Sequence, residues 1–451
     1  MDRSAEELVG DLDSFDPRRR RQALEALVAL HPPQQTPHRR PEVNVHVHTF
    51  YSYNAYGYSP SRFAWEAHRY GLEVAGIVDF DVLDGTEEFL EAGRLLRLKT
   101  VSGFETRVFV PELEGLVTNS PHEPGVAYLI STGFVQPPRP GTTAAETLAQ
   151  MAECAQRRNR RMVRRVNEHL EPVTVDYEQD VLPLTPAGNA TERHMLVAYD
   201  RKAREMFPDA GDLAQFWSEK LEEPPGAVRE LLDEPVELKA LIRARLMKYG
   251  GVGYAAPEEG SFPQMDDVLR MILDCGAVPS GGWLDGTHEG ERDPAELFGL
   301  WRRKGIPFIT IVPDRNWNLD DPEEKALKVA KLHEALDTAV EMQFPLLVGT
   351  EMNKHGRKFV DTFSAPELEP YRQVFLDGAH TAWGHTLLMM TAGVGYTTDW
   401  AEDQFGEDLG ARNEFFRRVG AAAYPDEAVL SRLERRGPEA RPDELVAAVE
   451  S

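Results

Sequence analysis

Short apolar runs recur along the chain, and the spacing between them leaves room for helices. The runs span residues 43–48, 74–78, 100–102, 126–130, 307–312 and 344–349. Runs of this length, rich in valine and isoleucine and bounded by polar residues, predict buried β-strands. Several of them end at a histidine, an aspartate or a glutamate, so ionisable side chains stand at the ends of predicted buried strands.

The segments between these runs carry the start and stop signals of helices. Ser59-Pro60, Asp293-Pro294 and Asp321-Pro322 each place a capping residue before a proline, and Gly71 and Gly305 follow the last turns of the first two. This is the usual punctuation of helix ends. The alternation of strand and helix predicts an α/β fold with a mostly parallel sheet.

Candidate metal ligands stand at the strand ends. His46 and His48 are two apart, so both imidazoles face the same side of the first strand. Glu105 and Glu351 follow later runs. In a parallel barrel the strand ends meet on one face, which would bring these four side chains together. Mixed imidazole and carboxylate ligands suit Zn, Mn or Fe, and such an ion activates water at neutral pH.

The same residues belong to a larger set of motifs: His46-Val47-His48, Asp79-Phe80-Asp81, Gly103-Phe104-Glu105, His194 and Gly349-Thr350-Glu351-Met352-Asn353. With these motifs the chain resembles the polymerase and histidinol phosphatase (PHP) domain family over roughly residues 41–365. It looks most like the larger uncharacterised bacterial members, which share a segment like 283–287. The resemblance implies a distorted seven-stranded (β/α)7 barrel with a two- or three-metal site that usually hydrolyses phosphoesters.

The resemblance also implies roles for single residues. His46 and His48 match the ligands of the first motif, and Glu105 matches the carboxylate that bridges two metals. His194 matches a later histidine ligand. Glu351 stands where the family commonly has an aspartate in its last motif.

The chain departs from the family pattern at several ligand positions. Phe80 and Asn353 stand where the family has histidines, residues 280–283 lack the usual Ala-His-Pro, and Tyr128 lies on a strand that often supplies a ligand. We therefore expect one well-supplied divalent transition metal and, at most, a second ion held by Glu105 and His194.

Other polar residues have supporting roles on this interpretation. Asp79 and Asp81 are expected to orient an imidazole ligand, as metal-bound histidines require. Arg193 is the first candidate for holding phosphoryl oxygens, and arginine does this with planar, paired donors. Further cationic candidates are Lys354, Arg357 and Lys358. His288 and His355 lie in polar loops, so we expect them to face solvent.

Composition limits the choice of partners and compartment. The 451 residues carry a formal net charge of −25, which disfavours a nonspecific nucleic-acid or anionic-membrane surface. No run approaches the roughly 18 apolar residues that span a bilayer. The two cysteines, Cys154 and Cys275, make no disulfide framework and fit a reducing interior. A cytoplasmic protein without membrane or nucleic-acid partners is expected; the oligomeric state is left open.

The chain divides into three predicted regions. Residues 1–40 are expected to form a helical extension that ends in a proline-rich linker at 31–37. Residues 41–398 form the barrel, with a charged helical segment at about 196–262 that either covers the site or adds outer helices. Residues 399–451 form a helical tail.

The leading hypothesis is an enzyme, a metal-dependent hydrolase that acts on a small phosphoester through a metal-activated water. A second hypothesis is a degenerate barrel that binds a ligand or metal without turnover, which the missing histidines support. A third is another metal-barrel enzyme, such as a sugar isomerase or an amidohydrolase, because the same ligands serve those reactions.

Overall fold

In the computed structural model, which describes residues 4–34, 39–256 and 260–451, the apolar runs form a β-sheet of seven strands in sequential order. The strands are β1 (Arg40–Val47), β2 (Leu72–Phe80), β3 (Lys99–Phe109), β4 (Val126–Thr132), β5 (Val278–Trp283), β6 (Phe308–Ile311) and β7 (Leu346–Val348). The sheet curls into a nearly closed barrel, so the predicted α/β barrel fold is confirmed. Residues 35–37 of the predicted linker lie outside the described residues.

One strand departs from the parallel arrangement. The pairs β1–β2, β2–β3, β5–β6 and β6–β7 are parallel, but β4 runs antiparallel to both β3 and β5. The connection from β3 to β4 contains a single 3-10 turn, Pro111–Leu113, in place of a long helix. A parallel crossover generally needs a helix, whereas an antiparallel pair does not. Residue Tyr128 therefore enters the barrel from a strand of reversed direction.

The barrel closes between β1 and the segment that follows β7. The backbone N–H of Glu351 donates to the carbonyl of His46 at 2.8 Å, and the N–H of His48 donates to the carbonyl of Glu351 at 2.9 Å. Gly349 makes this approach possible, because a Cβ there would lie 2.5 Å from the Cβ of His46 and 2.6 Å from its nitrogen. Glu351 itself has a left-handed backbone, with φ of 61°.

The predicted helices form around the barrel with the expected caps. Ser59 caps α3 (Pro60–Tyr70), Asp293 caps α11 (Pro294–Arg303) and Asp321 caps α13 (Pro322–Glu341), each by accepting backbone N–H groups. Four further helices around the barrel are α4 (Thr86–Leu96), α10 (Met265–Asp274), α12 (Asp314–Trp317) and α14 (Arg372–Thr391). They cover the apolar outer face of the strands, as in other barrels.

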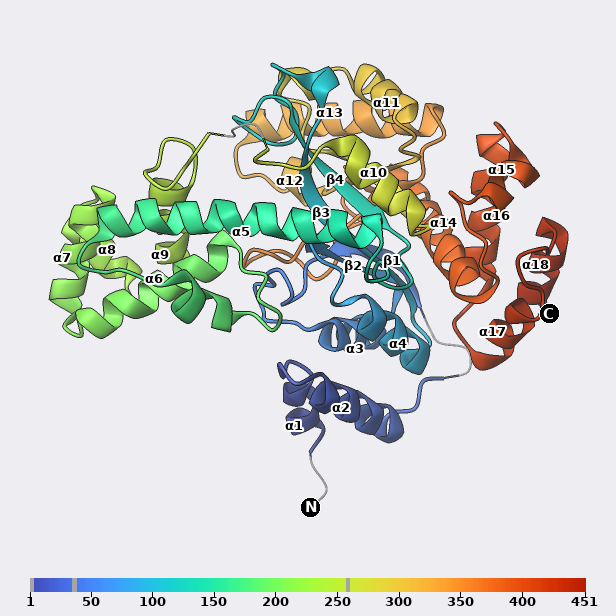
Figure 1. Cartoon of the computed structure of the whole chain (residues 1–451), viewed down its shortest axis with the longest axis horizontal. Helices are drawn as coiled ribbons and strands as arrows, with labels where there is room; N and C mark the ends of the chain where they lie inside the picture. Colours follow the sequence, from blue (N-terminus) through green and yellow to red (C-terminus); the bar gives the residue numbers. More distant parts are fainter. Residues whose placement is uncertain (1–3, 35–38, 257–259) are drawn as a thin grey trace. The chain divides into compact units, whose positions relative to one another are not determined.

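The N-terminal extension packs on α3 and α4 (Figure 1). It consists of α1 (Ala5–Asp11) and α2 (Pro17–Leu30), whose leucines join a core with Phe63 and Phe89. Arg20 is almost fully buried and pairs with Glu88 of α4. Losing either partner would leave a buried charge unpaired, so this contact fixes the extension in place.

Residues 51–53 and 150–262 form a second compact unit. The long helix α5 (Thr143–Leu170) enters it, and the chain continues through α6 (Glu192–Met206), α7 (Ala210–Leu221), α8 (Pro225–Leu231) and α9 (Pro235–Ile242) (Figure 1). Its apolar core is its own, with Trp217 and Tyr199 fully buried. The helical segment predicted at about 196–262 lies inside this unit.

The C-terminal tail packs on the first unit through α14 (Figure 1). It contains α15 (Asp399–Phe405), α16 (Leu409–Ala422), α17 (Glu427–Glu434) and α18 (Pro442–Glu450). Lys99 of β3, fully buried, donates to Glu73 at 2.5 Å and to the carbonyl of Ala421 at 3.0 Å. His380 and the hydroxyl of Tyr424 also contact Glu73, each at 3.1 Å. Glu73 therefore links the starts of two strands to the tail.

Within the described residues, we find no helix whose length and apolar character would let it cross a lipid bilayer.

The closing seam of the barrel should be sensitive to a single methyl group. Gly349→Ala would force the chain away from His46 and should lower the free energy of unfolding by about 1–3 kcal/mol, the usual cost of overpacking. Chemical denaturation measures this change. Gly10→Ala is the control, since a Cβ there meets nothing within 4 Å in helix α1 and alanine favours a helix. Equal effects of the two substitutions would contradict the role of Gly349.

The contact between Glu73 and the tail should be lost in acid. Burial opposes ionisation of Glu73, but the hydrogen bonds and charges of His380 and Lys99 outweigh it and lower the pKa to about 2. Because the folded pKa lies below the ordinary value of 4.5, this stabilisation is full above about pH 4.5 and disappears as the pH falls toward 2. Burial also lowers the pKa of His380, which acts in the same direction.

Limited proteolysis and circular dichroism between pH 6 and pH 2 should therefore detect release of the tail in acid. In Glu73→Gln the titrating group is absent, so the part of the pH dependence between about 4.5 and 2 should vanish. A Glu73→Gln variant with the same acid profile as the unmodified chain would show that another group governs docking of the tail.

Candidate metal centre

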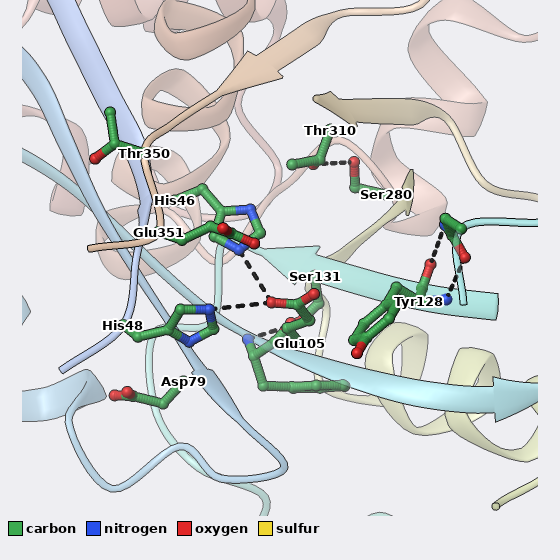
Figure 2. Close-up of polar contacts among 12 residues, drawn as sticks. His46, His48, Asp79, Glu105, Tyr128, Ser131, Ser280, Thr310, Thr350 and Glu351 are labelled. Atoms are coloured by element: carbon green, nitrogen blue, oxygen red, sulfur yellow. Dashed lines mark hydrogen bonds and ion pairs between the residues drawn. The ribbon is translucent and has the colours of Figure 1, made fainter. Parts of the chain in front are cut away.

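A buried cluster of two imidazoles and two carboxylates lies at the closing seam of the barrel. Among the described residues, one atom from each of His46, His48, Glu105 and Glu351 lies within 4.8 Å of the others, and all four residues are buried. We call these residues the His/Glu cluster. His46 belongs to β1, His48 directly follows it, Glu105 is on β3 and Glu351 follows β7, so the cluster draws on segments far apart in sequence (Figure 2).

Glu105 is the centre of the cluster. Its Oε2 lies 3.1 Å from Nε2 of His46 and 3.2 Å from Nε2 of His48. Burial alone would raise the pKa of Glu105, but the hydrogen bonds and charges of the two imidazoles outweigh burial and lower it. A carboxylate held ionised beside two imidazole nitrogens is a ready ligand set for a cation.

The spacing of these atoms fits one metal ion. Ligands at 2.0–2.1 Å in tetrahedral geometry lie about 3.3 Å from each other, close to the separations around Glu105. Among the described residues, the buried Nδ1 of His46 also has no hydrogen-bond partner. A buried side-chain nitrogen without a hydrogen-bond partner is unusual in a folded protein. The His/Glu cluster could therefore hold a divalent ion.

Glu351 already has a cationic partner. Nη2 of Arg315, in α12, lies 2.6 and 2.7 Å from the two carboxylate oxygens. Burial would raise the pKa of Glu351, but the charge of Arg315 outweighs it and lowers the pKa. In return, the charge of Glu351 raises the pKa of Arg315. Arg315 is not among the residues predicted from the sequence. It follows β6, so its position at a strand end was the available signal.

The residues around His48 fix its position. Phe80, which lies between Asp79 and Asp81, stacks on the His48 ring with centroids 4.2 Å apart. Asp79 accepts the backbone N–H of Thr49 at 2.7 Å and its hydroxyl at 2.6 Å, and so anchors the chain directly after His48. Phe80 thus holds the His48 ring in place by packing.

Asp81 braces the edge between β2 and β3. It has a left-handed backbone with φ of 61°, its N–H donates to the carbonyl of Glu105 at 2.9 Å, and its carboxylate accepts the hydroxyl of Thr106 at 2.5 Å. These contacts place Asp81 beside Glu105. They support the backbone that carries this ligand.

The other strands contribute hydroxyl groups. The hydroxyls of Ser280 on β5 and Thr310 on β6 are 2.7 Å apart, and Ser131 on β4 contacts the backbone of Phe104 (Figure 2). Tyr128 lies on β4 as well. The hydroxyl groups of these strands orient a polar ligand more readily than they bind a transition metal.

His194 and Arg193 lie in the second unit, at the start of α6. Nδ1 of His194 accepts the backbone N–H of Thr191 at 3.1 Å, and the ring packs edge-on against Tyr53. Burial lowers the pKa of His194 to about 4, so the ring is neutral. An accepting Nδ1 leaves the proton on Nε2, so binding of an ion through Nε2 requires the loss of this hydrogen bond. Arg193 lies over the ring of Tyr53.

The other predicted cations follow Glu351. Arg357 pairs with Asp314 of α12, and Lys358 donates to Thr362 and lies 4.5 Å from the centre of the Trp317 ring. Lys354 and His355 are exposed. Arg357 and Lys358 therefore brace the segment that carries Arg315 and Glu351.

No family model matches the chain, and no curated protein matches its sequence. Seven chains of solved structures match it, including the following two. A proposed metal-dependent phosphoesterase of Bifidobacterium adolescentis is 15% identical with a TM-score of 0.47, over 72% of this chain and 94% of that one. An amidohydrolase of Chromobacterium violaceum with bound sulfate and no metal is 12% identical with a TM-score of 0.46, over 74% and 96%.

Metal binding should depend on the His/Glu cluster. Titration calorimetry with Zn²⁺ or Mn²⁺ is expected to give one tight site, and His46→Ala should weaken it by more than about 100-fold, since loss of even a supporting residue commonly costs 10- to 100-fold. His355→Ala is the matched control, because this imidazole is exposed only four residues from Glu351. Similar affinities for the two variants would place the bound ion elsewhere.

Proposed function

We propose that the chain is a metal-dependent hydrolase of a small phosphoester. The observation that carries the proposal is the buried His/Glu cluster with the guanidinium of Arg315 at its edge. When bound, a divalent ion supplies activation of water at neutral pH and polarisation of a phosphoryl oxygen. His46, His48 and Glu105 would hold the ion, and Glu351 would complete or adjust its ligand set.

The charges of the site favour an anionic substrate. With neutral imidazoles, as metal ligation requires, the two carboxylates and Arg315 together carry one negative charge. A divalent ion would change this to one positive charge in a buried setting where charges act strongly. Arginine also matches phosphoryl oxygens with paired donors. A dianionic phosphomonoester satisfies these features better than the neutral substrates of an isomerase or an amidohydrolase.

Several roles remain part of the proposal. Asp79 and Asp81 act as positioning residues, through Thr49 and through the backbone of Glu105. Arg193 is proposed to contact the phosphoryl group, and His194 to bind a second ion after giving up its bond to Thr191. In the reaction, a water oxygen bonds to phosphorus, the ester P–O bond breaks, and the leaving alcohol takes a proton.

A second candidate function has its own observation. Arg315 neutralises Glu351 through both carboxylate oxygens, as expected of a barrel that binds a ligand without turnover. A screen of the metal-loaded protein against phosphomonoesters, cyclic nucleotides and sugar phosphates decides between the two. Turnover that a chelator abolishes supports the hydrolase, and bound metal without turnover on any of these classes favours the binding protein.

Substitutions at His48 and Asn353 should have very different effects on turnover. His48→Ala removes a ligand, so turnover should fall by several orders of magnitude as water returns to its ordinary pKa. Asn353→Ala should do far less, because Asn353 stands where the family has a histidine ligand that this chain lacks. Initial rates on the best substrate of the screen measure both. Severe loss in both variants would place Asn353 in the working site.

A further inference from the structure

Arg315 uses only part of its hydrogen-bonding capacity on Glu351. A single nitrogen, Nη2, meets both oxygens of the carboxylate, although a guanidinium has five N–H donors. Among the described residues, its buried Nε has no hydrogen-bond partner. The side chain is 36% exposed, so one edge of the group contacts Glu351 while another remains open to a ligand.

The carboxylate of Glu351 has two possible partners, Arg315 and an ion in the His/Glu cluster. The carboxylate pairs with Arg315, and one of its oxygens also lies within 4.8 Å of the ligand atoms of His46, His48 and Glu105. The backbone of Glu351 is held in place, because its N–H bonds to His46 of β1 and its carbonyl accepts from His48, directly after β1. Only the carboxylate is able to turn, so its choice of partner is the adjustable feature of the site.

We infer that Glu351 exchanges partners when the site fills. In the metal-free protein it neutralises Arg315; with a cation in the His/Glu cluster, its carboxylate turns toward the ion and frees the guanidinium for an anionic group such as a phosphoryl group. Arg315 is then the residue that selects an anionic substrate, and it does so only when the metal is present. The inference rests on the proposed function and adds to it an order of binding.

The exchange makes cation and anion binding cooperative. The ion lowers the cost of freeing Arg315, and an anion on Arg315 lowers the cost of drawing Glu351 to the ion. Such coupling is reciprocal, so each ligand raises the affinity of the other by the same factor. Arg357, which pairs with Asp314 next to Arg315, helps to keep α12 in place during the exchange.

Titration calorimetry with Mn²⁺, in the absence and presence of sulfate, tests the coupling. Sulfate is the probe because it is a tetrahedral dianion like a phosphoryl group. In the unmodified protein we expect sulfate to tighten Mn²⁺ binding at least about fivefold, within the usual range of such couplings. In Arg315→Met, Mn²⁺ should bind more tightly than in the unmodified protein without sulfate, and the effect of sulfate should fall below about twofold.

A second variant tests the same exchange by changing Glu351 instead of Arg315. Glu351→Gln removes the charge that occupies Arg315, so the metal-free variant should bind sulfate more tightly than the metal-free unmodified protein. Sulfate binding to Glu351→Gln can be measured even if Arg315→Met does not fold. Arg97→Met is the control: Arg97 forms an ion pair with Asp426 before the start of β3, outside the His/Glu cluster, and the effect of sulfate should persist in it.

The outcomes separate the inference from the function on which it rests. Failure of the unmodified protein to bind Mn²⁺ would overturn the proposed function. Mn²⁺ binding that sulfate leaves unchanged, or an effect of sulfate that survives in Arg315→Met, would overturn the partner exchange and leave the metal centre intact.

Discussion

The candidate site depends on two backbone hydrogen bonds that join Glu351 to His46 and His48. They tie the first strand to the segment after the last, and three of the four cluster residues take part in them. Closing the barrel and assembling the ligands are therefore one event. The approach is so close that only glycine fits at position 349, and Glu351 adopts a left-handed backbone, which non-glycine residues rarely do outside special sites.

The seam also buries charge, and this sets the electrostatics of the site. Glu105 and Glu351 are both buried within a few ångströms of each other. A buried carboxylate is costly unless it is paired or bound to a cation. Two imidazoles contact Glu105, and Arg315 pairs with Glu351. These partners offset the cost of burying the two carboxylates, and the remaining negative charge still attracts a divalent ion.

The N-terminal ends of the strands contribute to stability. There, Glu73 and Lys99 form a buried ion pair that His380 and Tyr424 of the C-terminal segments complete. In barrels of this kind the chemistry gathers at the C-terminal ends of the strands, while the other face serves stability. The same division holds here, with carboxylates at both ends of the strands but different partners for each.

The sequence by itself determined the α/β barrel, the helix starts at Ser59, Asp293 and Asp321, and which side chains stand at strand ends. These features follow from local rules: the period of apolar residues, capping chemistry, and the common direction of strands. The tertiary structure decided the reversed direction of β4, the stacking of Phe80 on His48, and the pairing of Arg315 with Glu351. Each of these depends on contacts between segments distant in the chain, such as the 36 residues that separate Arg315 from Glu351, and no local pattern encodes which distant partner a side chain will meet.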